Sequence, residues 1–185
     1  MIITASSHPL AYWYATRATG VVALVLLTLA VVLGIADVSR LQSERWPRFI
    51  VDGVHRRVSM LSVAFVVVHI ATTVLDGYVP VGWLDAVIPF RSPYRTVWLG
   101  LGAVSFDLLL AVIITSLLRA RVGYRSWRAI HWLAYACWPV ALAHGAGTGS
   151  DFSRSWMLVI DGICVIAVLA AIAVRISGDA LEAPA

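Results

Sequence analysis

Residues 55–69 read HRRVSMLSVAFVVVH, an apolar run with a histidine at each end. Farther along, residues 131–144 read HWLAYACWPVALAH and repeat the arrangement. The first two histidines are 14 residues apart and the second two are 13 apart. Apolar runs of this kind predict membrane-spanning helices, and ionisable side chains inside a membrane are costly and usually functional. The four histidines are therefore the strongest functional signal in the chain.

The composition is that of a membrane protein. Of the 185 residues, 61% are hydrophobic and only 13% are charged, and the mean hydropathy is +0.87. A soluble domain has about a quarter of its residues charged. All 14 basic residues are arginines, and they flank the apolar runs, which argues against a nucleic-acid partner.

Five segments are apolar over about the 20 residues that cross a bilayer. The expected spans are at about residues 18–36, 55–75, 96–118, 129–146 and 155–174. The expected fold is an all-α membrane protein, a single transmembrane domain over residues 1–185, built as a bundle of about five helices. Membrane lipid is its immediate surrounding, and no oligomeric state is predicted.

The arginines are divided unevenly between the two ends of these spans. Ten lie at one end: Arg40, Arg45, Arg48, Arg56, Arg57, Arg119, Arg121, Arg125, Arg128 and Arg175. Four lie at the other: Arg17, Arg91, Arg95 and Arg154. Because basic residues gather on the cytoplasmic side, we expect the N-terminus outside and the C-terminus in the cytoplasm. The expected location is the cytoplasmic membrane of a bacterium.

With this topology the second and fourth spans run parallel and outward. His55 and His131 then lie at the inner end, and His69 and His144 lie about 20 Å farther out, at 1.5 Å per residue. A neutral imidazole is a good axial ligand for haem iron. Zinc is less favoured, because it takes four ligands and no carboxylate or thiolate is expected at either depth.

The 13-residue spacing raises a geometrical difficulty. At 100° per residue, His55 and His69 are about 40° apart around their helix, whereas His131 and His144 are about 140° apart. A straight fourth helix would not point both of its histidines at the second. Pro139 lies between them, and a proline permits a kink.

Several short stretches carry a family resemblance: His55-Arg56, His69, SWRAIHW at 126–132, and Ala143-His144-Gly145. Together they resemble the ferric reductase-like transmembrane family, which includes the membrane parts of NADPH oxidases and the haem subunit of the bacterial methionine sulfoxide reductase system. The segment TRATG at 16–20 resembles the start of a family helix that carries an outward arginine. The resemblance covers about residues 11–175.

The resemblance implies two b-type haems between the second and fourth helices, one held by His55 with His131 and one by His69 with His144. The chain has no CxxCH, so the haems should be non-covalent. It would then be the membrane subunit of an oxidoreductase, passing electrons from a cytoplasmic donor to an external acceptor such as a ferric complex or oxygen. Because only about ten residues follow the last expected span, the expected donor is a separate flavoprotein, an FMN or FAD held through a partner, or a quinol.

Three arginines are further candidates for cofactor binding. Arg17 is a candidate partner for an outer haem propionate or an anionic acceptor, and equally an ordinary interfacial arginine. Arg56 and Arg128 flank the inner ligands and are candidates for propionate binding, although they also serve the topology. Asp107 and Asp161 should face the bundle and find hydrogen-bond partners there.

Two other functions stay open at this point. A quinol-oxidising b-type cytochrome would share the haems but take its electrons from quinol. A proton-coupled transporter would use the buried histidines as a relay, although such proteins often show broken helices and internal repeats.

Overall fold

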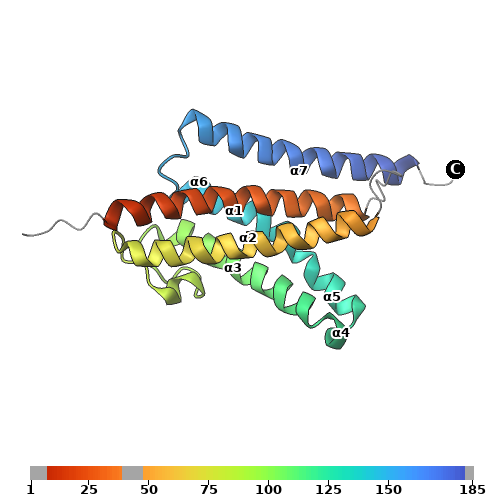
Figure 1. The fold of residues 1–185 in the computed structure, drawn as a ribbon, viewed down its shortest axis with the longest axis horizontal. Coiled ribbons are helices and arrows are strands. Elements are labelled where there is room, and N and C mark those ends of the chain that lie inside the picture. The colour runs from red at the N-terminus through yellow and green to blue at the C-terminus, as the bar shows by residue number, and fades with distance from the viewer. Residues whose placement is uncertain (1–7, 39–47, 182–185) are drawn as a thin grey trace, which may run out of the picture.

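The computed structural model describes residues 8–38 and 48–181, and the regular structure within these ranges is helical (Figure 1). The elements are α1 (His8–Val38), α2 (Arg48–Asp76), η1 (Trp83–Ala86), α3 (Thr96–Leu117), α4 (Arg119–Val122), α5 (Tyr124–His131), α6 (Leu133–Thr148) and α7 (Ser155–Leu181). The all-α membrane class expected from the sequence is confirmed.

Four of the described helices are long and apolar enough to cross a membrane: Leu10–Asp37, Phe49–Asp76, Thr96–Leu117 and Ser155–Ser177. They correspond to four of the five expected spans. The helix α2 begins at Arg48, seven residues before the expected span. The expected span at 129–146 is built from two consecutive helices, α5 and α6, of 8 and 16 residues.

The interruption between α5 and α6 falls at Trp132, directly after His131. The Trp132 carbonyl accepts the N–H of Tyr135 at 3.1 Å, a bond that spans three residues and is tighter than the α-helical pattern. By contrast, α6 continues through Pro139, so the break does not lie at the proline. The two histidines of this segment therefore lie on different helices, and the angle calculated for one straight helix does not apply.

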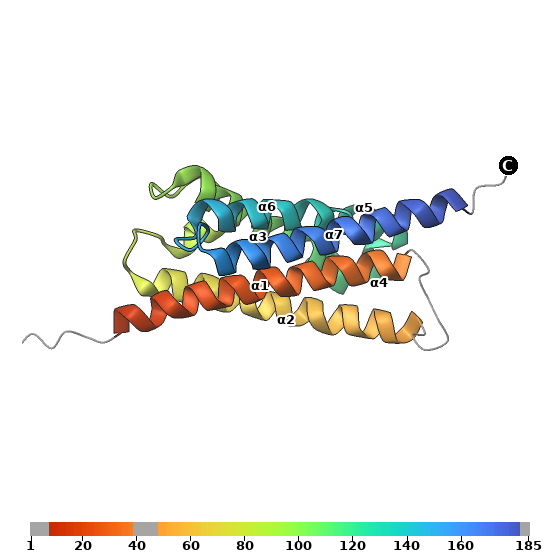
Figure 2. The same ribbon diagram turned by 90° about the horizontal axis from the view of Figure 1, so that it is seen from above.

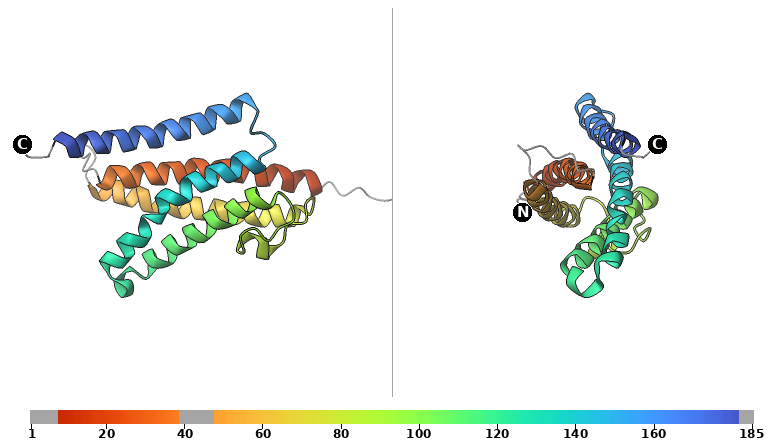
Figure 3. Two further views of the ribbon diagram at one scale, coloured as in Figure 1. Left: turned by 180° about the vertical axis from the view of Figure 1, so that it is seen from behind. Right: turned by 90° about the vertical axis from the view of Figure 1, so that its right-hand side faces the viewer.

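Successive long helices alternate in direction (Figures 1 and 2). The helices α1, α3 and α7 run from the end of the bundle that holds η1 toward the end that holds α4, and α2 and α5–α6 run back. We call these the η1 end and the α4 end. Consequently α2 and α6 are parallel, as expected. The helix α2 packs along α1 and α6 packs along α3, while α7 lies at the margin against α1 (Figure 3).

The buried core lies where α1, α6 and α7 meet. Its members are Leu27, Cys137, Trp138, Cys164 and Val168. Within it, the Trp138 Nε1–H donates to the hydroxyl of Thr28 at 2.9 Å, which ties α6 to α1. Because lipid is as apolar as these side chains, such packing and interhelical hydrogen bonds hold helices together inside a membrane. Cys137 and Trp138 lie between His131 and His144 in the chain, so this contact supports the segment that carries both histidines.

Candidate functional site

The structure brings the four histidines into two facing pairs. The rings of His55 on α2 and His131 on α5 have centroids 6.3 Å apart and planes at 69°. The rings of His69 on α2 and His144 on α6 have centroids 6.3 Å apart and planes at 83°. The first pair lies toward the α4 end and the second toward the η1 end. These are the pairs expected from two parallel helices.

The separation of the rings suits one metal ion held between two imidazoles. A first-row metal lies about 2.0 Å from an imidazole nitrogen and the ring centre about 1.1 Å behind it, so two such rings on opposite sides of an ion have centres about 6.2 Å apart. Both pairs have this spacing. Each pair therefore has the ring spacing that two ligands of one metal ion require.

Three of the four imidazoles donate a hydrogen bond from Nδ1 to a helix carbonyl. The bonds run from His55 to Ala30 (3.0 Å), from His69 to Thr16 (2.8 Å) and from His144 to Trp98 (2.8 Å). Because a carbonyl only accepts, Nδ1 carries the proton in each case and Nε2 keeps its lone pair. Metal-ligating histidines are typically fixed in this way.

The ring of His131 is positioned differently. Its Nδ1 is buried and has no hydrogen-bond partner within the described residues. The ring packs instead against Trp127 on the preceding turn, with centroids 5.0 Å apart and planes at 31°. Trp127 is itself held, because its Nε1–H donates to the Ser116 hydroxyl at 3.2 Å and the Arg119 guanidinium lies 4.2 Å over its ring. The fourth imidazole is thus oriented by ring packing.

The donor set favours haem iron over a bare metal ion. No group of three or more histidine, cysteine, aspartate or glutamate side chains that could hold a metal ion is found in the described ranges. A protein zinc site uses three or four such ligands. Two opposed imidazoles match the two axial positions of haem iron, whose other ligands are porphyrin nitrogens. The residues present fit a bis-histidine haem at each level.

The arginines singled out from the sequence lie at both ends of the bundle. At the η1 end, Arg17 forms an ion pair with Asp151, and its guanidinium lies 3.9 Å over the ring of Trp13. Any role of Arg17 toward an anionic ligand therefore competes with an existing carboxylate partner. At the α4 end, Arg56 and Arg128 are both exposed.

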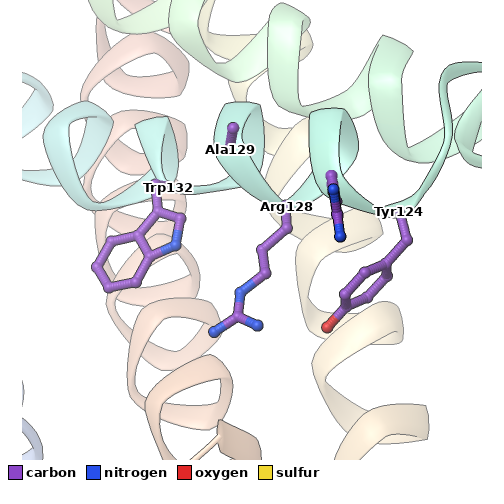
Figure 4. Close-up of a pocket in the computed structure, with 5 residues that line it drawn as sticks. Tyr124, Arg128, Ala129 and Trp132 are labelled. Carbon is purple, nitrogen blue, oxygen red and sulfur yellow. The ribbon is translucent and has the colours of Figure 1, made fainter.

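An open cavity of about 540 Å³ lies on the surface of α5 (Figure 4). It is lined by Tyr124, Arg125, Arg128, Ala129 and Trp132. The ring of Tyr124 lies 5.7 Å from that of Trp127, which in turn contacts His131. A series of aromatic contacts therefore joins the cavity to one of the four histidines.

The two intramembrane carboxylates differ in their surroundings. Asp161 on α7 is 9% exposed, and its Oδ1 has no hydrogen-bond partner among the residues described. The partner expected for this carboxylate is therefore missing at that oxygen. Asp107 on α3 is half-buried.

The sequence reasoning gave no role to the residues that lie behind the rings. Trp127 was noted only as part of a family-like stretch, and Gly102, whose backbone lies against His144, was not noted. A signal for such glycines was present on α1, where Gly20 and Gly34 are 14 residues apart, the same spacing as the two histidines of α2.

Comparison with known proteins identifies a family. The family model described as the ferric reductase like transmembrane component matches residues 19–142, which is 124 of the 185 residues. The match includes three of the paired histidines and ends two residues before His144. Proteins of the matched family commonly bind haem. No curated protein and no solved structure matches the chain.

Proposed function

The chain belongs to the ferric reductase-like transmembrane family, and on that basis we propose that it carries electrons across a membrane through two b-type haems. His55 and His131 hold one haem iron, and His69 and His144 hold the other. The observation that carries the proposal is the pair of opposed imidazoles found twice, each with ring centroids 6.3 Å apart. The two levels lie about 20 Å apart along the helices.

The ligand set favours electron transfer over oxygen chemistry at the iron. When bound, haem supplies one-electron chemistry by cycling between ferric and ferrous iron. The two imidazoles of each pair would both be used in holding the haem iron, which would leave no free position on the metal for a substrate. Terminal reduction of an external acceptor then takes place outside the ligand pairs, toward the η1 end.

The charge distribution supports electron entry at the α4 end. The arginines at this end include Arg56, Arg57, Arg119, Arg121, Arg125, Arg128 and Arg175. Because basic residues gather on the cytoplasmic side, we place this end in the cytoplasm, with the bacterial plasma membrane as the location. The His55–His131 level then receives electrons first and the His69–His144 level second.

The cavity on α5 is a suitable docking place for the donor. Arginine binds phosphate through two parallel hydrogen bonds, and Arg125 and Arg128 line the cavity together with the rings of Tyr124 and Trp132. This combination suits a planar, phosphate-bearing donor such as reduced FMN, whether free or carried by an acidic flavoprotein. The ring of Tyr124 contacts Trp127, which contacts His131, and this series supports a donor site next to the first level.

A quinol donor is the competing proposal, and the second described cavity gives it little support. A second cavity, of about 280 Å³, is lined by Val32, Ile35, Ala36, Ala167, Ala170, Ala171 and Val174. A quinol needs polar groups for its two oxygens as well as an apolar wall. The side chains that line this cavity are all apolar.

Reduction of the purified protein with alternative donors tests the proposal. With NADPH alone the haem absorbance should stay that of the oxidised form, and adding a flavin reductase with FMN should reduce it. Rapid reduction by NADPH without flavin would contradict the proposed donor. Faster reduction by a quinol than by the flavin system would favour the quinol-oxidising cytochrome.

A further inference from the structure

We propose that Gly20, Gly34 and Gly102 are positioning residues, each of which opens a helix carbonyl to the Nδ1–H of one ligand histidine. The proposal rests on the proposed haem function and assigns the residues that set the orientation of three of the four ligands. It follows from the same local geometry found at three separate places.

The arrangement at His69 shows the principle. Its Nδ1–H donates to the carbonyl of Thr16, and its ring lies against Gly20, four residues later on α1. A helix carbonyl already accepts the N–H four residues later, but it keeps a second lone pair on the outside of the helix. A side chain at the later residue would cover that lone pair. A Cβ on Gly20 would lie 3.0 Å from both Nδ1 and Cε1 of the imidazole.

The same relation recurs at His144 on the other pair of helices. Its Nδ1–H donates to the carbonyl of Trp98, and the residue four positions later on α3 is Gly102. A Cβ there would lie 2.6 Å from Nδ1 and from Cε1. No real Cβ contact is that short, so a larger residue would have to move the ring or the helix.

A third example, with more room, is found at His55. The ring donates to the carbonyl of Ala30, and the residue four positions later is Gly34. A Cβ on Gly34 would lie 3.4 Å from Cε1, which is a tight but ordinary contact. The three sites therefore form a graded series.

The fourth histidine lacks both parts of the arrangement. The helices α3 and α5–α6 are antiparallel. Thr115 lies 13 residues after Gly102 and His131 lies 13 residues before His144, so Thr115 is the residue of α3 that corresponds to Gly102 for the ring of His131. Thr115 carries a side chain, and its hydroxyl donates to the carbonyl of Ala111, four residues earlier, at 2.6 Å. This is the one ligand ring whose Nδ1 has no partner in the described part of the chain. The glycine and the hydrogen bond are absent together.

The hydrogen bond has a consequence for the metal. It fixes the tautomer and the ring orientation, and it makes the imidazole a stronger donor. A stronger donor favours ferric over ferrous iron, so losing the bond should raise the reduction potential of the affected haem. The change in reduction potential should be confined to the haem held by the affected histidine, because each glycine contacts one ring.

Alanine substitutions in the full chain test the proposal, with haem content and redox titration as readouts. Gly102→Ala should lose the His69–His144 haem, so that haem per chain falls to half. Gly20→Ala should keep both haems and raise the potential of that same haem. Gly34→Ala should give a smaller upward shift, confined to the other haem. Gly162→Ala is the matched control, because a Cβ at this residue of α7 meets nothing within 4 Å, and it should leave the titration unchanged.

Unchanged potentials in Gly20→Ala and Gly34→Ala would overturn the proposal, even if Gly102→Ala does not fold. Equal loss of both haems in either variant would also overturn it, because that is the result expected if the glycines serve only helix packing. A wild-type chain that binds no haem would overturn the proposed function, and this inference with it, before any substitution is made.

Discussion

The His69–His144 and His55–His131 pairs have the same ring separation but are built from different contacts. Both rings of the first pair donate to backbone carbonyls, and both lie within regular stretches of α2 and α6. In the second pair only His55 does so, while His131 ends α5 and packs on Trp127. Backbone carbonyls thus orient both rings of the His69–His144 pair. In the His55–His131 pair, the orientation of one ring depends on the side chain of Trp127, near the arginine-rich end. The His55–His131 level, which we propose receives electrons first, is expected to be the more easily perturbed.

The largest expected effect is the loss of a whole haem. His69→Ala and His144→Ala should each remove the same spectroscopic component, and His55→Ala and His131→Ala should each remove the other. Redox titration of the four variants checks this. If His69→Ala and His131→Ala showed matching losses, the pairing would be wrong and the comparison of the two levels would fail.

A smaller effect is expected from the contact that holds His131. Trp127→Ala removes the packed ring, and such ring pairs contribute about 0.5–1.5 kcal/mol, which corresponds to roughly 2- to 12-fold weaker haem retention. The loss should affect the His55–His131 haem alone and should be largely restored in Trp127→Phe. Trp156→Ala, at an exposed residue of α7, is the control. A loss shared equally by both haems would remove the distinction between the levels.

A spectroscopic difference should be visible without any substitution. The imidazole planes of the His69–His144 pair are at 83°, so they would affect the two π-type d orbitals of iron almost equally. The planes of the His55–His131 pair are at 69°, so their effects on the two orbitals would be less equal. Electron paramagnetic resonance of the oxidised protein should therefore show two low-spin signals at high g value, with the larger from the His69–His144 level. The variants that lack one haem assign the signals. A resolved rhombic triplet from both levels would contradict the ring orientations.

The smallest effect is expected at the surface. Arg121→Glu with Arg125→Glu should slow reduction by the flavin system a few-fold at low salt, because exposed charge pairs contribute only about 0.2–1 kcal/mol each. The difference should shrink at high salt through screening. Haem content should not change, and Arg154→Glu at the η1 end should have no effect. If Arg154→Glu slowed haem reduction equally, the proposal that electrons enter at the α4 end would be contradicted.

Much of the fold could be predicted because membrane spans follow from length and hydropathy alone. The expected spans at 96–118 and 155–174 begin at the first residues of α3 and α7. The pairs of histidines followed from the same reasoning, since parallel helices bring matching positions to equal depth. Helix ends were less predictable, because α2 continues beyond its apolar run into a polar segment, starting at Arg48.

The break between α5 and α6 could not be predicted from Pro139, the residue most expected to interrupt a helix. Proline removes one backbone N–H, yet α6 continues through Pro139 while the interruption falls at Trp132. Next to the break, Trp127 on α5 donates to Ser116 on α3, a tertiary contact that the sequence alone does not predict. The glycine positions were hidden for a similar reason: Gly102 has a role only when His144, 42 residues away, lies against it.

The haem content of the purified wild-type chain tests the central claim most directly. A pyridine haemochrome assay reports haem type and amount together, and protein concentration gives the ratio. Two opposed imidazole pairs predict two non-covalent b-type haems per chain, both extractable by acidic organic solvent. One haem per chain at full occupancy, or none, would contradict the account.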